Sequence, residues 1–462
     1  MQIINKTCNT IYLSDIDLYI PFTENNPIEI SLDNAKKSRI FRQMVISKKL
    51  FIFSCGSSLF EKNLLKLQDK DLPIKKQVQQ EFPEPTGELE VRVSGHFYES
   101  SGYAKANRNL VFGLAYHKVK VGIAPEIPVG TLLTEITAKK LSVLRKPVSK
   151  KAIQIDSAIP TFGKKKENCS YNIILTTIES ITIPDIFVEK LNYYDEIWVP
   201  SNFCKEVLSK RIDKPIFVLP NSIDINLYKE SVAPYTFNPP LNKFVFFSVF
   251  GWNYRKGYDV LLRSYLEEFD YRDDVTLLLM TRQATQLSSK NRKIKNEVQS
   301  YIGKYCPTGS PHIMMYNSLL PEYKMPSLYR ACDAFVLFTR GEGFGYPYCE
   351  ASLCGLPVIG TNCSGQSMFL NKDNCCLLEP DQYSKLSKGY TNIHYWDGEE
   401  MADLTSDRFI KHTKAAMRDV YENKYKYKER NHLLRSKIIN EYNIKTVSKI
   451  AKERLEVIWS KL

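Results

Sequence analysis

The chain contains 462 residues, a length that predicts two or three domains rather than one. Its 43% hydrophobic and 12% aromatic residues exclude a disordered chain, because they suffice to form sizeable buried cores. The net charge of +13 favours anionic partners such as nucleotides, phosphorylated lipids, membrane surfaces or nucleic acids, although a lysine-rich solvated surface gives the same charge.

The sequence predicts neither a signal peptide nor a membrane span. Residues Met1 to Asn5 lack a basic region followed by an apolar run. The most apolar stretch, Phe244 to Trp252, is much shorter than the roughly 20 residues that cross a bilayer. The eleven cysteines are scattered without CxxC spacing, which indicates reduced thiols. We therefore expect a cytoplasmic protein, with any membrane contact limited to peripheral association.

Residues 1–75 are predicted to form an accessory α+β module, followed by a linker at 76–88. Strand-like runs occur at 10–13, 28–30 and 50–53, and a helical stretch at 35–47. Polar residues and prolines then mark the linker. This module shows no motif that carries chemistry.

From residue 89 the pattern becomes strand, glycine loop and helix, and it defines a second unit at 89–235. Gly95 and Gly102 bracket the first loop, and apolar residues at helical spacing follow Gly102. Ser201 is placed to cap a helix that begins after Pro200. Strand candidates lie at 89–93, 152–155, 172–176, 196–199 and 215–219.

A second set of alternations follows the proline-rich stretch at 234–240 and defines a unit at 240–430. Strand candidates lie at 244–250, 275–280, 312–316, 334–339 and 358–360, with helices at 258–269, near 323–330 and from Pro347. Continuous apolar strands that alternate with helices predict parallel sheets covered on both faces. Two such sheets in one chain imply a ligand cleft between them. The remaining residues, 431–462, are helical and charged, and one option is that they pack back on the first sheet.

The most informative stretch is FVLFTRGEGFGYPYCEASLCGLPVIGTN, residues 335–362. A buried strand ends at Arg340, a glycine loop follows, and Pro347 suits the first turn of a helix. Such a loop presents free backbone N–H groups to phosphate or to a sugar hydroxyl. Glu342 in the loop and Glu350 in the expected first helical turn can bind vicinal hydroxyls; by spacing alone, they could equally be surface residues that stabilise a helix start.

Arg255 and Lys256 form a second motif, because they lie just before a helix in the stretch SVFGWNYRKGYDVLL, residues 248–262. Two cations at this position could neutralise a diphosphate group. An isolated Arg-Lys pair is otherwise a solvated basic turn.

Together these motifs resemble the signature of the retaining glycosyltransferases of family 4, which have the GT-B fold of two doubly wound Rossmann-like domains facing a cleft. The two glutamates separated by seven residues match Glu342 and Glu350. The resemblance implies that Glu342 and the amides of Gly343, Phe344 and Gly345 contact the donor sugar. It further implies that Glu350 binds the nucleotide ribose and that Lys256 binds donor phosphate; Arg255 is the less direct match for the family's arginine.

The N-terminal unit also resembles this family over residues 95–108, its first glycine loop. The resemblance implies that Gly102 lies where this loop closes over the donor phosphates and the acceptor. One departure concerns the histidine that many members carry after the middle strand. Here Glu179 follows that strand, and we expect it to orient or deprotonate the acceptor hydroxyl, or else to be a buried structural carboxylate.

We therefore expect a retaining glycosyltransferase that moves a sugar from a nucleotide-sugar donor to a hydroxyl of a glycan, lipid or other acceptor. The alternatives are a nucleotide-sugar epimerase on the same fold or a nucleic-acid-binding protein, which would glycosylate DNA if the two ideas combine. We expect no metal and no cofactor, because Asp15 and Asp17, although spaced as a DxD motif, lie in the accessory module. Basic clusters that could attract an anionic acceptor, or merely decorate loops, occur at 139–140, 145–146, 150–151 and 164–166.

Overall fold

The computed structural model describes residues 2–5, 11–13, 18–20, 28–29, 50–54, 82–126, 133–163, 169–282, 288–316, 320–385 and 398–462. Two expectations from the sequence, the Asp15–Asp17 pair and the basic cluster at 164–166, lie outside these residues, as does the helix expected at 35–47. In the first module, β1 (Gln2–Asn5) pairs antiparallel with β4 (Ile28–Glu29) and β5 (Leu50–Ser54). A separate hairpin joins β2 (Ile11–Leu13) and β3 (Leu18–Ile20).

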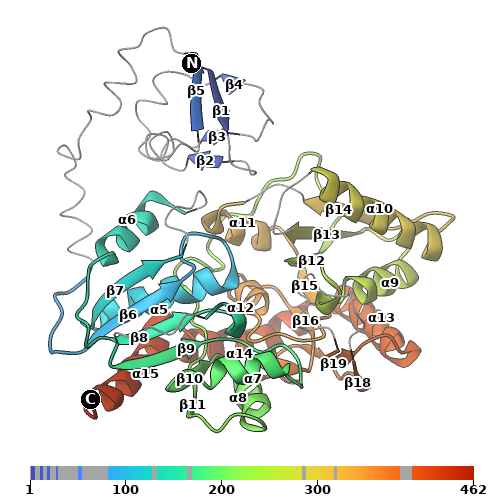
Figure 1. Cartoon of the computed structure of the whole chain (residues 1–462). Helices are drawn as coiled ribbons and strands as arrows, with labels where there is room; N and C mark the ends of the chain where they lie inside the picture. Colours follow the sequence, from blue (N-terminus) through green and yellow to red (C-terminus); the bar gives the residue numbers. More distant parts are fainter. Residues whose placement is uncertain are drawn as a thin grey trace.

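The N-terminal domain is built on a parallel six-stranded sheet with the order β11-β10-β9-β8-β6-β7 (Figure 1). Its strands are β6 (Glu90–Gly95), β7 (Lys120–Pro125), β8 (Ile153–Ser157), β9 (Tyr171–Leu175), β10 (Glu196–Val199) and β11 (Ile216–Val218). Its helices are α5 (Gly102–Tyr116), α6 (Glu135–Leu144), α7 (Asp185–Leu191) and α8 (Asn202–Ser209). The Ser201 hydroxyl accepts the Cys204 N–H at 3.2 Å, so the predicted cap of α8 is confirmed.

The C-terminal domain repeats this arrangement with the strand order β14-β13-β12-β15-β16-β17, again all parallel. Its strands are β12 (Phe244–Gly251), β13 (Val275–Arg282), β14 (His312–Tyr316), β15 (Ala334–Leu337), β16 (Val358–Thr361) and β17 (Cys376–Leu378). Its helices are α9 (Tyr258–Glu268), α10 (Ser288–Tyr305), α11 (Met325–Arg330), α12 (Tyr346–Leu353), α13 (Asp407–Glu422) and α14 (Lys424–Glu441). A hairpin of β18 (Gln382–Lys385) and β19 (Glu400–Asp403) completes the domain.

The two sheets have apolar cores of their own, as the continuous apolar strands predicted. Buried side chains on the two faces of the N-terminal sheet form separate clusters, and one large cluster encloses the C-terminal sheet. The expected α/β architecture of two doubly wound domains is therefore confirmed. Among the described helices, none is both long and apolar enough to cross a bilayer.

The last helix, α15 (Ile444–Trp459), packs on the N-terminal domain although it follows the C-terminal one (Figure 1). A Cβ atom built on Gly113 of α5 would lie 2.4 Å from the Ser448 side chain, so only glycine permits this close helix contact. The boundary expected at residues 430 and 431 falls inside α14; the chain instead returns after that helix, where Ile223 donates its N–H to the Tyr442 carbonyl at 2.8 Å. Ile223 also forms a parallel bridge with Asn443.

Candidate active site

A cavity of about 370 Å³ lies between the two domains, within the range of small-molecule sites. It is lined by residues from the carboxyl ends of strands in both sheets, where ligands bind in open α/β folds. The sequence-predicted residues that line it are Gly102, Glu179, Arg255, Lys256, Glu342, Gly343, Phe344, Gly345 and Glu350. The structure thus brings every predicted site residue to one pocket.

The loop between β15 and α12 places Glu342 against the two cations of the loop after β12. The Glu342 carboxylate accepts a hydrogen bond from Lys256 and one from the Thr339 hydroxyl at 3.1 Å, and it lies 3.4 Å from Arg255 Nη1. Burial disfavours its charge, but Lys256 and Arg255 outweigh that effect and hold the pKa of Glu342 below its ordinary value. Glu342 is therefore an anion that hydroxyl groups can approach as donors.

For Lys256, in contrast to Glu342, the surroundings disfavour the charged form. Burial and the neighbouring Arg255 charge lower the pKa of Lys256, and Glu342 and Glu179 oppose that shift only in part. The local chain explains this crowding, because Gly257 adopts a positive φ of 66° and a Cβ there would lie 1.7 Å from the Phe338 carbonyl oxygen. The glycine thus lets the Arg255–Lys256 turn press against the end of β15.

Arg255 connects the C-terminal domain to Glu179 of the N-terminal domain. Its Nη2 atom lies 3.0 Å from Glu179 Oε1, and its Nη1 atom donates to the Gly341 carbonyl. Burial raises the pKa of Glu179, and the charges of Arg255 and Lys256 only partly offset this. The carboxyl group that we expected on the acceptor side therefore holds its proton more tightly than an ordinary glutamate does.

Two glycines of the β15–α12 loop make the domain contact very close at this point. A Cβ atom on Gly341 would lie 1.8 Å from the Glu179 carbonyl oxygen, and one on Gly343 would lie 1.4 Å from Thr177 Oγ1. Any side chain at either position would push the domains apart. The glycine loop predicted from the sequence as a phosphate or sugar cradle is also a contact surface between the domains.

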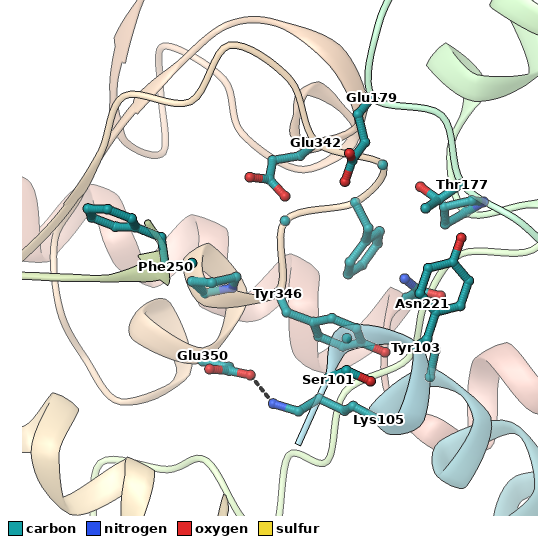
Figure 2. A pocket seen from close by; sticks show the side chains of 18 of the residues that line it. Ser101, Tyr103, Lys105, Thr177, Glu179, Asn221, Phe250, Glu342, Tyr346 and Glu350 are labelled. Carbon is teal, nitrogen blue, oxygen red and sulfur yellow. Dashed lines mark hydrogen bonds and ion pairs between the residues drawn. The ribbon is translucent and has the colours of Figure 1, made fainter. Parts of the chain in front are cut away.

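At the other end of the pocket, Glu350 accepts a hydrogen bond from Lys105 (Figure 2) and another from the Tyr329 hydroxyl at 2.8 Å. Lys105 also lies 3.1 Å from Glu322, which in turn binds Arg108. Burial opposes ionisation of Glu322, yet Lys105 and Arg108 lower its pKa to about 2. Glu350 is the fifth residue of α12 and lies in the second turn of that helix, whereas the sequence placed it in the first turn.

Gly102 and Phe344 line the pocket but offer a ligand no polar side-chain group. Gly102 begins α5, whose cap Ser101 accepts the Ala104 N–H at 3.1 Å, and a Cβ on Gly102 would meet nothing closer than 3.9 Å. The Phe344 ring is 3% exposed and packs on Phe369. Contact between Phe344 and a ligand would therefore involve its backbone amide rather than its ring.

Lys105, Arg108 and Glu322 were given no role from the sequence. Lys105 and Arg108 lie one turn apart on the first part of α5, within the stretch 95–108 that resembles the family's first glycine loop, but neither side chain was given a role there. A lysine immediately after a glycine loop at a helix start was the available signal. Among the described residues, no three His, Cys, Asp or Glu side chains group closely enough to hold a metal ion.

The chain is similar in part to a known protein family and, in fold, to several solved structures. Residues 242–393 match the family model described as glycosyl transferases group 1. No curated protein matches the chain in sequence. Sucrose-phosphate synthase from Thermosynechococcus elongatus superposes with a TM-score of 0.56 at 13% identity, over 81% of this chain and 100% of that chain.

Two further solved structures are similar over the same extent. HepE from Anabaena, in complex with UDP and glucose, gives a TM-score of 0.52 at 14% identity, over 80% of this chain and 100% of that chain. A structure described as trehalose-6-phosphate from E. coli, bound with UDP-2-fluoro glucose, gives 0.54 at 13% identity, over 80% and 99%. At such low identities the likeness shows the fold, which is the GT-B fold predicted from the sequence.

Proposed function

We propose that this chain, whose residues 242–393 match the family model of the glycosyl transferases group 1, is a glycosyltransferase that moves a sugar from a nucleotide donor to an acceptor hydroxyl. The observation that carries the proposal is the meeting of Lys256, Glu342 and Glu350 in one pocket between the domains. Two cations beside two carboxylates suit a ligand that combines a diphosphate with hydroxyl-bearing rings.

The pairing of charges in the pocket supports an exchange of partners when the donor binds. Sugar hydroxyls would donate to Glu342 and ribose hydroxyls to Glu350, which releases Lys256 and Lys105 from these carboxylates. Each freed ammonium group can then donate to a phosphate oxygen. Every buried charge keeps a partner in this exchange. A buried charge left without a partner would cost several kcal/mol.

In the transfer step, the bond between the anomeric carbon and the diphosphate oxygen breaks, and a bond forms to the acceptor oxygen. The diphosphate leaves with the bonding electron pair, and Arg255 and Lys256 stabilise its developing charge. The acceptor proton passes to the leaving phosphate oxygen or to Glu179. Resemblance to the family 4 enzymes supports attack on the face from which the diphosphate departs, hence retention of anomeric configuration.

Domain contact supports exclusion of water during transfer, because the loops carrying Glu179 and Glu342 meet across the pocket. We propose a donor with a UDP moiety as the first to test, since HepE and the E. coli structure hold UDP or a UDP-sugar on the same fold. The proposed reaction needs no metal or other cofactor, because the pocket's own cations face the diphosphate.

The experiment is a thermal-shift screen of the purified chain against UDP-, GDP-, ADP-, CMP- and dTDP-sugars. One nucleotide class should raise the melting temperature, and Glu350→Gln should remove the effect. The matched control is Glu268→Gln, which changes a glutamate that binds Arg418 outside the pocket. Absence of any shift contradicts the proposal. Products of the identified donor then distinguish the candidates: an epimerase converts the sugar without an acceptor, and an inverted product in NMR contradicts retention.

A further inference from the structure

Arg340 belongs to the motif that carries Glu342, yet its side chain is buried outside the pocket. It precedes Glu342 by two residues, and only 1% of its side chain is exposed. It does not line the cavity, whereas Arg255 and Lys256 do. Arg340 is therefore not a third cation for the diphosphate. Its burial needs another explanation, because an uncompensated buried charge is strongly destabilising.

Two neighbours hold the guanidinium group of Arg340 in one orientation. Its Nη1 and Nη2 atoms donate to the two carboxylate oxygens of Asp259, in the first turn of α9, at 2.8 and 2.7 Å. Its central carbon lies 3.6 Å from the centre of the Tyr254 ring. A planar group that is bound at two points and stacked on a ring cannot rotate, and an ammonium group cannot reproduce this geometry.

Arg340 also binds the two peptide groups that precede the cations of the pocket. Its Nη1 atom donates to the Tyr254 carbonyl at 2.6 Å, and its backbone N–H donates to the Arg255 carbonyl at 2.7 Å. These carbonyls belong to the peptide bonds that lead into Arg255 and into Lys256. The orientation of a peptide plane determines where the next side chain leaves the backbone. Arg340 therefore sets the directions of Arg255 and Lys256.

The short turn Tyr254–Lys256 needs such a restraint because it holds two cations side by side. Burial and the neighbouring charge of Arg255 both lower the pKa of Lys256. Rotation of the turn would relieve both effects by moving one cation into water. The Thr339 hydroxyl restrains the turn as well, because it donates to the Arg255 carbonyl at 3.2 Å. The segment that follows β15 thus holds the cations that face its own glutamate.

We propose that Arg340 is a positioning residue for the donor diphosphate: it fixes the Arg255–Lys256 turn so that both cations face the pocket. This inference rests on the proposed function and adds a residue outside the pocket to its donor site. Arg340 acts through backbone carbonyls, so it affects only ligands that reach the two cations. A nucleoside without phosphates does not reach them and should bind equally with or without Arg340.

The test is titration calorimetry of the full chain with UDP, GDP, ADP, CDP and dTDP, followed by NMR titration with the nucleoside of the diphosphate that binds. Arg340→Lys keeps the charge but loses the planar group. It should weaken diphosphate binding about 10-fold and change the nucleoside affinity by less than about 2-fold. In a Lys256→Met background it should weaken diphosphate binding by less than about 3-fold, because one of the groups that it positions is absent.

Arg418→Lys is the matched control, because Arg418 also binds a carboxylate, that of Glu268, and stacks on a ring, that of Phe269, but lies outside the pocket. It should lower the melting temperature and leave the diphosphate affinity unchanged. Tyr254→Leu is the milder variant if Arg340→Lys does not fold. It removes only the stacked ring and should weaken diphosphate binding about 2- to 5-fold.

Three results would each overturn the positioning role while the unsubstituted chain still binds the diphosphate. They are an unchanged diphosphate affinity in Arg340→Lys, or in Tyr254→Leu where it takes its place; an equal loss for the nucleoside; and an undiminished loss in the Lys256→Met background. If none of the nucleoside diphosphates binds the unsubstituted chain, the proposed function fails together with this inference.

Discussion

Lys105 of the N-terminal domain donates to the Glu350 carboxylate of the C-terminal domain, so one ion pair spans the cleft. The Lys105 ammonium also lies 3.1 Å from the Tyr228 hydroxyl and 3.1 Å from Glu322. Burial disfavours the lysine charge, but Glu322 and Glu350 outweigh it and raise the pKa of Lys105. The carboxylate proposed to bind ribose is therefore held by a cation from the opposite domain.

We predict that Lys105→Met lowers the melting temperature by about 5 °C, because loss of one partner leaves a buried carboxylate uncompensated. Adding Glu350→Gln should recover part of this loss, since the unpaired charge is then removed. Differential scanning calorimetry of the single and double variants measures the coupling. Lys190→Met is the control, because Lys190 forms an exposed pair with Glu189 and should have no measurable effect. Strictly additive shifts would show that the pair does not hold the domains together.

We predict that Glu342→Gln separates nucleotide binding from transfer. The amide cannot hold Lys256 by charge, so Lys256 becomes free for phosphate and the affinity for the nucleoside diphosphate should stay equal or rise. The kcat for transfer should fall about 100-fold, because the donor sugar loses its charged acceptor of hydrogen bonds. Titration calorimetry with the nucleotide and steady-state kinetics provide the two readouts. Weaker nucleotide binding with unchanged kcat would contradict the assigned role.

The raised pKa of Glu179 leads to a prediction about how the stability of the protein depends on pH. Its pKa is raised by burial, so between the ordinary carboxyl pKa and this raised value the folded chain binds more protons than the unfolded chain does. Stability should therefore fall as the pH rises through that window. Glu179→Gln removes this penalty, and its melting temperature should exceed that of the unsubstituted chain at pH 7.5, with the difference vanishing near pH 4.

The same substitution should lower kcat by about 100-fold or more if Glu179 accepts or orients the acceptor proton. The acidic limb of the kcat profile should also disappear in Glu179→Gln. A variant that is destabilised at pH 7.5 and retains full activity would identify Glu179 as a structural partner of Arg255 alone.

Gly343→Ala tests the close contact between the domains. The new methyl group would meet Thr177 Oγ1, so we expect the domains to remain apart and transfer to fall at least about 100-fold, while each domain stays folded. Small-angle scattering should show a larger radius of gyration. Gly303→Ala is the control, because a Cβ on that helical glycine meets nothing within 4 Å and should leave activity unchanged or slightly raise stability. Unchanged activity in Gly343→Ala would contradict a closed reactive state.

Much of the fold could be predicted because its central strands are continuous apolar runs. The runs Phe244 to Phe247 and Leu277 to Met280 are buried in the core of the C-terminal domain, as their apolar sequence predicted. By contrast, β7 was not predicted, because Lys120 to Pro125 contains a glycine and ends in proline.

Only the part of the candidate site that lies within single local motifs could be predicted from the sequence. Glu342 lies in the loop after β15, and Glu350 lies in the helix that follows this loop. Because strands and helices alternate here, both residues are expected at the carboxyl edge of the C-terminal sheet. The partners Lys105 and Glu322 lie 217 residues apart and belong to different domains. Their pairing depends on how two rigid bodies meet, and no spacing in the sequence encodes that arrangement.

The two passages of the chain between the domains lie side by side where Ile223 bridges to Asn443. Two connections at one place would act as the pivot for any rotation of one domain against the other. A single rotation would then make or break the Lys105–Glu350 and Arg255–Glu179 contacts in concert. The chain that follows Tyr442 thus provides a second connection between the domains. Cutting the chain there would leave the domains joined by one connection instead of two.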